Sequence, residues 1–229
     1  MIVTIHQPEH MPWTGFFNKM SKADLYVHLD DVQYKKNNFQ NRNKVVASSG
    51  SPFWISIPLQ DNGHTQKINE KRMRECSWRN TYLEKIKDSY ANAKYFDDYF
   101  EEIEKIIQEK YDNLADFNIA LIDWFRNKLQ IHTKTIKSSS IAHQGSKSDL
   151  IENICLSLGA DTYLSGASGR DYLNLESFKF KGMEVLFHSF IPPVYKSLNY
   201  HPGLSSLDVL MNCGPLSREI ILFPQNCPA

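Results

Sequence analysis

The chain has 229 residues, of which 41% are hydrophobic and 23% charged, a composition typical of an ordinary globular protein with a sizeable core. Its 26 basic and 26 acidic residues balance, which excludes the strong overall positive charge of a typical nucleic-acid-binding protein. No run approaches the roughly 18 apolar residues of a membrane span, and the N-terminus lacks the layout of a signal peptide. We therefore expect a cytoplasmic protein without a transmembrane segment.

The first part of the chain predicts a strand, a turn, a helix and a second strand. The apolar run Ile2 to Ile5 is followed by His6, and a second run, Leu25 to Leu29, is followed by Asp30. Ligands bind at the carboxyl ends of parallel strands, so we expect half of an active site where these two runs end. The neighbouring residues expected to bind substrate are Gln7, Trp13 and Asp31.

His6 and Asp30 are the predicted catalytic residues. An imidazole titrates near neutral pH and suits a general base, although a histidine after a buried strand can also be a core residue bonded to backbone. Asp30 could orient His6, bind the substrate or hold Mg²⁺, whereas the structural alternative is a carboxylate that caps a turn. Because side chains alternate along a strand, we expect only one of Asp30 and Asp31 to face the site.

Two polar segments flank the next predicted strand. Gln33 to Asn43 reads as a loop rich in hydrogen-bond donors, and Arg42 with Asn43 suggests a clamp for an anion or a sugar, or simply a solvated loop. Phe53 to Leu59 predicts another strand of the sheet. Gln60 to Arg74, which includes His64, is a second polar loop, and such loops commonly carry function.

Helical spacing runs through residues 77–131, and we expect this stretch to be a helical insertion that serves as scaffold. The α/β alternation then resumes. Residues 133–141 predict a strand, and 146–149 resemble a capping box that opens a helix ending at Gly159. Four widely spaced cysteines form no CxxC pair, so we expect reduced thiols and no metal site.

A second chemically informative stretch follows the short strand predicted at 160–164. Two glycines and two serines before Arg170 give a backbone able to close around an anion, although a plain glycine-rich turn has the same composition. His188 lies near the end of the strand predicted at 183–190, and Ser168 with His188 is a weaker candidate for covalent serine catalysis, since no GxSxG elbow exists. The binding residues expected here are Ser165, Gly166, Ser168, Gly169, Arg170, Tyr172 and His188.

Together these elements predict one α/β domain over residues 1–229, with a mainly parallel, Rossmann-like sheet and the helical insertion at 77–131. The strand ends carrying His6 and Asp30 and the loop from Ser165 to Tyr172 should then meet in one cleft. The last residues, from Arg218 onward, read as a proline-rich tail.

Five motifs in order along the chain resemble the WbqC-like protein family. They are IHQPEHMPWTGFF, LYVHLDDVQY, NRN at 41–43, TYLSGASGRDYL and LSSLDVLMNCG. The resemblance implies a bacterial protein encoded among genes for surface-polysaccharide biosynthesis, with a proposed role in moving glycine or another small acyl unit onto a sugar. It also implies that Asp208 and Asn212, within the last motif, bind substrate, and that His10, where relatives often have an aromatic residue, is not essential.

A more distant resemblance in layout is to the nucleotidylyltransferase and pantothenate synthetase superfamily, although both histidines of that group's HxGH motif are absent here. Three hypotheses follow. The first is a transferase of the acyl or aminoacyl type that acts on a nucleotide-activated or lipid-linked sugar of an O-antigen-type polysaccharide. The second is an ATP-using nucleotidylyltransferase or ligase, and the third is a non-catalytic partner in glycan assembly. The sequence identifies no cofactor and no oligomeric state.

Overall fold

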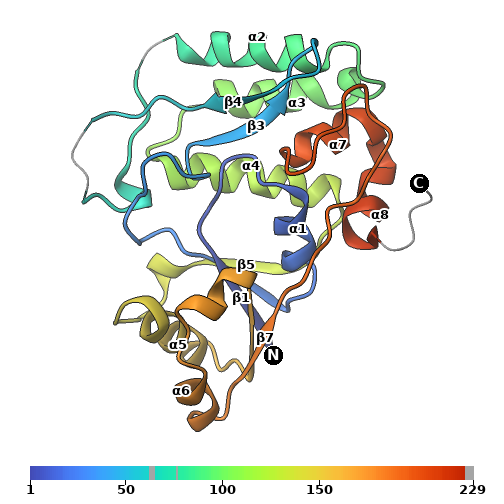
Figure 1. Cartoon of the computed structure of the whole chain (residues 1–229). Helices are drawn as coiled ribbons and strands as arrows, with labels where there is room; N and C mark the ends of the chain where they lie inside the picture. The colour runs from blue at the N-terminus through green and yellow to red at the C-terminus, as the bar shows by residue number, and fades with distance from the viewer. Residues whose placement is uncertain (62–64, 76, 225–229) are drawn as a thin grey trace.

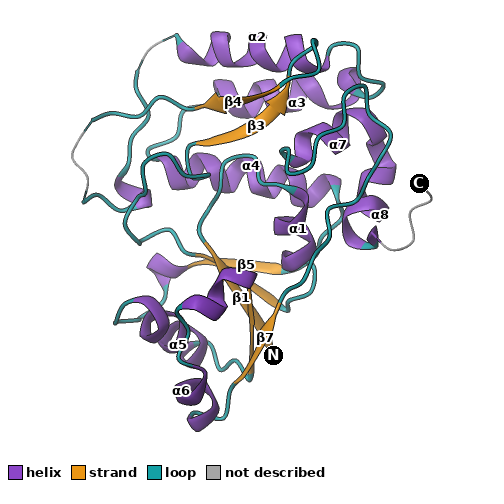
Figure 2. Ribbon diagram, viewed as in Figure 1, coloured by secondary structure: helices purple, strands orange, loops and turns teal. Residues whose placement is uncertain are grey.

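A computed structural model describes residues 1–61, 65–75 and 77–224. Five parallel strands form the central sheet in the order β5-β2-β1-β6-β7 (Figures 1 and 2). Their bounds are Ile2–His6 for β1, Leu25–His28 for β2, Lys134–Lys137 for β5, Thr162–Ser165 for β6 and Glu184–Phe187 for β7. This arrangement confirms the predicted α/β fold with a mainly parallel sheet.

The register of the sheet brings the ends of the first strands together. His6 of β1 lies opposite His28 of β2, which in turn lies opposite Lys137 of β5. On the other side of β1, the pairing of Val3 with Tyr163 places the end of β6 beside the end of β1. Because all five strands run in the same direction, their carboxyl ends share one edge of the sheet.

Each face of the sheet is covered by different helices (Figure 1). Val3, Ile5 and Val27 pack in one apolar cluster with α5 (Lys147–Ser157) and Phe178 of α6 (Leu175–Phe180). The opposite face, with Tyr26, packs against α1 (Thr14–Met20) and the helices beyond it. Every residue of α1 is buried, so this short helix lies between the sheet and the rest of the protein.

Three helices occupy the stretch predicted to be a helical insertion: α2 (Trp78–Tyr90), α3 (Phe96–Gln108) and α4 (Leu114–Lys128). They pack together with α7 (Ser206–Cys213) and α8 (Ser217–Leu222). The tail predicted from Arg218 is therefore wrong as far as Leu222, because Ile220 and Ile221 are buried and form part of α8. No helix among the described residues is long and apolar enough to cross a membrane.

A small antiparallel hairpin lies apart from the central sheet. It pairs β3 (Arg42–Val46) with β4 (Pro52–Ser56), joined by a tight turn in which Gly50 has a φ of +90°. Two predictions are corrected here, because Arg42 and Asn43 belong to a strand rather than a loop, and the strand predicted at Phe53 to Leu59 does not join the main sheet. Pairing across a short turn is local and favourable, and the polar composition of β3 concealed it.

Candidate functional site

His6 stands at the carboxyl end of β1 with a third of its side chain exposed (33%). Its Nδ1 atom lies 3.0 Å from the carbonyl oxygen of Gln7. Since a carbonyl only accepts, Nδ1 carries the proton of the neutral ring, and Nε2 is left as an acceptor 3.8 Å from Oε1 of Glu9. Burial, and then the charge of Lys19, lower the pKa of His6 to about 3. The imidazole is therefore neutral at physiological pH and able to accept a proton.

Glu9 and Lys19 form a buried pair of opposite charges beside His6. Lys19 is 3% exposed and donates to the carbonyl oxygen of Ile5 at 3.4 Å. Burial lowers the pKa of Lys19 to about 8, against the opposing effect of Glu9. Burial also raises the pKa of Glu9 to about 7, and Lys19 opposes this shift. Glu9 thus exchanges a proton readily at neutral pH, which is the property of a general acid or base.

Tyr26 and His28 complete this group on the same face of the sheet. They are 0% and 1% exposed, and their rings meet edge to face with centroids 4.9 Å apart. Burial raises the pKa of Tyr26, with Glu9 as the second cause, and burial and Arg126 lower the pKa of His28 to about 4. We refer to His6, Glu9, Lys19, Tyr26 and His28 as the His6 cluster.

Several buried polar atoms of the His6 cluster have no hydrogen-bond partner among the residues that the structure describes. They are Oε2 of Glu9, the hydroxyl of Tyr26 and both ring nitrogens of His28. A buried polar atom without a partner costs about 1–3 kcal/mol, so folded proteins rarely keep several together unless water or a ligand satisfies them. Unsatisfied polar atoms and shifted pKa values in one place are typical of a functional site.

The loop after β6 lies against this cluster. A Cβ atom on Gly166 would be 4.0 Å from Nζ of Lys19, and the hydroxyl of Thr4 donates to the carbonyl oxygen of Leu164 at 2.7 Å. Ser165 is buried, with its hydroxyl 3.0 Å from the carbonyl oxygen of Gly166. The segments around His6 and Gly166 are therefore neighbours, as their adjacent parallel strands require.

The later residues of the same loop point outward. Ser168 is exposed, the guanidinium of Arg170 lies over the ring of Phe187 at 4.1 Å, and Tyr172 is 44% exposed. Gly169 is buried and packed so closely that a Cβ atom would lie 2.0 Å from the hydroxyl oxygen of Ser165. The glycine at 169 is thus required by the local packing of this turn.

Asp30 is held by neighbouring groups, and no contact among the described residues joins it to His6. Its carboxylate accepts from the hydroxyls of Ser138 and Ser139 at 3.0 and 2.7 Å, and from the side-chain amide of Asn69 at 3.3 Å. Asp31 shares the hydroxyl of Ser138 with Asp30, and its Oδ2 lies 3.0 Å from Nε2 of His143. The carboxylate that faces His6 in the structure is that of Glu9.

The hairpin and the loop that precedes it supply contacts that fix the turn after β1. Gln7 accepts from the side-chain amide of Gln40 at 2.7 Å, and the buried side chain of Asn43 donates to the carbonyl oxygens of His10 and Met11. Arg42 donates to the carbonyl oxygen of Asn37 and lies over the ring of Trp54 at 4.3 Å. Each of these side chains is thus engaged in contacts within the protein.

Trp13 and His188 meet through an aromatic side chain between them. Phe190 packs edge to face with Trp13 and stacks on His188, whose Nε2 atom is 2.8 Å from Oδ1 of Asn18. Burial lowers the pKa of His188 to about 4, followed by the charges of Lys22 and Lys19. The hydrogen-bond partner of His188 is thus Asn18 of α1, and no described contact joins His188 to Ser168.

Asp208 and Asn212 lie on α7, away from the strand ends. The hydroxyl of Tyr195 donates to Asp208 at 2.8 Å, and burial raises the pKa of Asp208 to about 6. Asn212 donates to the carbonyl oxygen of Asp208 at 2.8 Å and accepts from the backbone amide of Leu198 at 3.3 Å. In this position they hold the segment before α7 rather than the cluster at β1.

Glu9 and Lys19 are absent from the residues that the sequence indicated. Lys19 lies between Phe17 and Met20 in a helix whose neighbours are apolar, and a cation in such a setting is unusual. This unusual cation was the feature of the sequence that could have indicated Lys19 as a site residue. Glu9 lies in the turn directly after the predicted base, only three residues from His6, where a partner for an imidazole is most easily supplied. His64, Cys76 and Cys227 lie outside the described residues.

Comparisons with known proteins agree over nearly the whole chain. A model of the WbqC-like protein family matches residues 7–220. A protein of Mycobacterium tuberculosis named "Uncharacterized protein Rv1507c" is 29% identical over 226 residues, which cover 96% of this chain and 97% of that protein. No solved structure gives a significant match.

Proposed function

Because the chain belongs to the WbqC-like protein family, we propose that it is a transferase of bacterial surface-polysaccharide biosynthesis. The reaction moves a small acyl or aminoacyl group, such as glycine, onto a nucleotide-activated or lipid-linked sugar. The observation that carries this proposal is the His6 cluster. It combines a neutral imidazole at the end of β1, a carboxyl group with a pKa near 7 in the following turn, and the ammonium group of Lys19 from α1.

Acyl transfer requires the protein to assist three changes in the reactants. The attacking hydroxyl or amine of the sugar must lose a proton, the carbonyl oxygen must gain negative charge without penalty, and the leaving group of the donor must receive a proton. A bond forms between the sugar heteroatom and the acyl carbon, and the bond from the acyl carbon to the donor breaks. The proton removed from the sugar is the one returned to the donor's leaving group.

His6 and Glu9 supply the proton transfers in this scheme. Nε2 of His6 accepts the proton of the attacking group, and Glu9, which is close to half ionised at neutral pH, relays it to the leaving group. Lys19, charged at neutral pH and almost fully buried, stabilises the oxyanion. Asp30 acts as a positioning residue, since its bonds to Ser138, Ser139 and Asn69 hold the segment after β2.

A thermal-shift panel of nucleotide sugars, acyl-coenzyme A compounds and ATP tests the proposal before substrates are known. A ligand that binds only the folded state raises the unfolding temperature, and saturation at about 100 times Kd contributes about 2.7 kcal/mol. We expect shifts with an acyl donor and a nucleotide sugar, and weaker shifts with Lys19→Met. The matched control is Lys85→Gln, an exposed lysine on α2. A shift with ATP alone would favour nucleotidyl transfer instead.

A further inference from the structure

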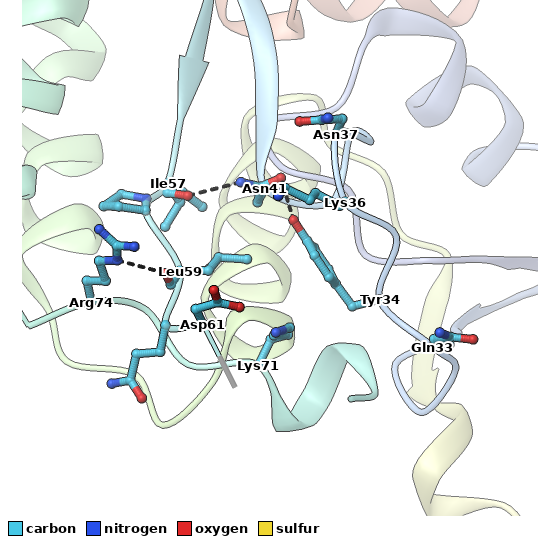
Figure 3. Close-up of a pocket in the computed structure, with 12 residues that line it drawn as sticks. Gln33, Tyr34, Lys36, Asn37, Asn41, Ile57, Leu59, Asp61, Lys71 and Arg74 are labelled. Carbon is cyan, nitrogen blue, oxygen red and sulfur yellow. Dashed lines mark hydrogen bonds between the residues drawn. The ribbon is translucent and has the colours of Figure 1, made fainter. Parts of the chain in front are cut away.

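A pocket lies between the hairpin and the two polar segments that flank it (Figure 3), and none of its lining residues belongs to the His6 cluster. Its volume is about 570 Å³, within the range of small-molecule sites. Residues of the loop before β3 form one wall, and residues 57–61 with Lys71 and Arg74 form another. Hydrogen bonds from Tyr34 to Gln66 and from Ile68 to Val32 join these walls through the backbone.

The lining of the pocket is cationic in a protein without net charge. Lys36, Lys71 and Arg74 line it, and Asp61 is the acidic side chain among its described lining residues. A neighbouring pocket of about 490 Å³ shares Arg74 and Gln60 and adds more basic than acidic side chains. The described lining of the two pockets thus carries more basic than acidic side chains, which favours an anionic ligand.

Lys71 and Arg74 are held in place before any ligand arrives. Lys71 is only 4% exposed, its ammonium lies 5.4 Å from the ring centroid of Tyr34, and its carbonyl oxygen accepts from the backbone amide of Leu114 at 2.7 Å. Arg74 donates through Nε to the carbonyl oxygen of Leu59 at 2.9 Å, which orients its terminal nitrogens. Both side chains therefore line the pocket in positions fixed by the protein itself.

Amide and phenol groups line the same space. The hydroxyl of Tyr34 donates to Oδ1 of Asn41 at 2.9 Å, and Nδ2 of Asn41 donates to the carbonyl oxygen of Ile57 at 3.0 Å. Asn37 and Gln33 also belong to the lining of the pocket. Such groups exchange hydrogen bonds with hydroxyls, and a tyrosine ring offers a flat surface to a sugar or a base.

We propose that this pocket binds a phosphorylated carbohydrate, with Lys36, Lys71 and Arg74 on the phosphate oxygens and the amide side chains on the hydroxyl groups. A free sugar phosphate and a nucleotide sugar share this chemistry. The inference goes beyond the proposed acyl transfer, because binding here uses no side chain of the His6 cluster. It also assigns a role to Lys71 and Arg74, which belong to the second polar segment of the sequence analysis.

Isothermal titration calorimetry with glucose 1-phosphate, UDP and UDP-N-acetylglucosamine tests the proposal. The double variant Lys36→Gln/Arg74→Gln changes exposed side chains and should fold. Since hydrogen bonds to charged groups contribute about 1.5–3 kcal/mol, we expect its affinity to fall at least tenfold, with a weaker dependence of Kd on salt. Tighter binding of the UDP compounds identifies a nucleotide sugar as the ligand, and equal binding identifies the sugar phosphate.

Two controls separate this pocket from the other site. Lys85→Gln removes one exposed charge far from the pocket and should leave Kd unchanged. His6→Ala should also bind the probe as tightly as the unaltered protein, whatever becomes of its activity. The proposal is overturned if none of the probes binds, or if the double variant binds as the unaltered protein does while His6→Ala loses binding.

Discussion

Acid pH should destabilise the protein through His10, and the variant His10→Gln should remove that part of the loss. His10 is fully buried, with Nδ1 3.2 Å from Oδ1 of Asn118 and Nε2 2.5 Å from the hydroxyl of Tyr82. Burial, opposed by the bond to Asn118, lowers the pKa of His10 to about 4. The unfolded chain therefore binds a proton at this histidine at a higher pH than the folded chain does.

The direction and size of the change in unfolding free energy follow from this difference in proton binding. Above an ordinary histidine pKa of about 6.5 neither state carries the proton, and stability from this group is complete. As pH falls, each unit costs about 1.4 kcal/mol of unfolding free energy, so the loss between pH 7 and pH 5 is about 2 kcal/mol. The raised pKa values of Glu9 and Asp208 act in the opposite direction, and a comparison of protein and variant cancels them.

Urea unfolding at pH 7 and pH 5 measures the effect. We expect His10→Gln to lose about 2 kcal/mol less than the unaltered protein between these pH values, even if it is less stable at both. The matched control is His132→Gln, because His132 is exposed and surrounded by solvent in both states. Equal losses for the unaltered protein and His10→Gln would refute the reasoning.

Two further changes probe the packing around the sites. Gly169→Ala should lower the free energy of unfolding by about 1–3 kcal/mol in urea, because the added Cβ would overlap the hydroxyl of Ser165. Gly166→Ala should lower it less, since only Lys19 lies nearby, at 4.0 Å, and equal losses for the two variants would contradict this reasoning. Asn118→Ala should cost about 2–4 kcal/mol, since Asn118 bonds the carbonyl oxygens of Pro8 and Gln40 and also His10, and a loss below about 0.5 kcal/mol would count against it.

The sequence predicted the fold well because the signals were local and regular. Alternating apolar runs and helical spacing specified a parallel sheet, and the strand ends then had to lie together. The hairpin was missed since β3 is largely polar, and α8 was missed because a short helix near proline residues resembles a tail. Neither element has the long periodic pattern on which such predictions depend.

The candidate site was harder to predict, because shifted pKa values arise from burial that the sequence does not display. His6 and the loop at Gly166 could be placed at one edge from strand order alone. The partner of His6 could not be predicted in the same way. Asp30 follows the neighbouring strand and Glu9 follows His6 in the turn, and only the structure shows that Glu9 faces the imidazole. To predict that Lys19 belongs to the site, one would have to know that α1 is buried on all sides.

Mass spectrometry of the sugar product tests the central claim most directly. The unaltered protein is incubated with nucleotide sugars and a panel of glycyl and other acyl donors, and each sugar is examined for the mass of the added group. The account predicts an acylated sugar with the unaltered protein and with His132→Ala, and a rate lower by about 10²- to 10⁴-fold with His6→Ala. Product formed by His6→Ala at the unaltered rate, or release of pyrophosphate without acylation, would contradict it.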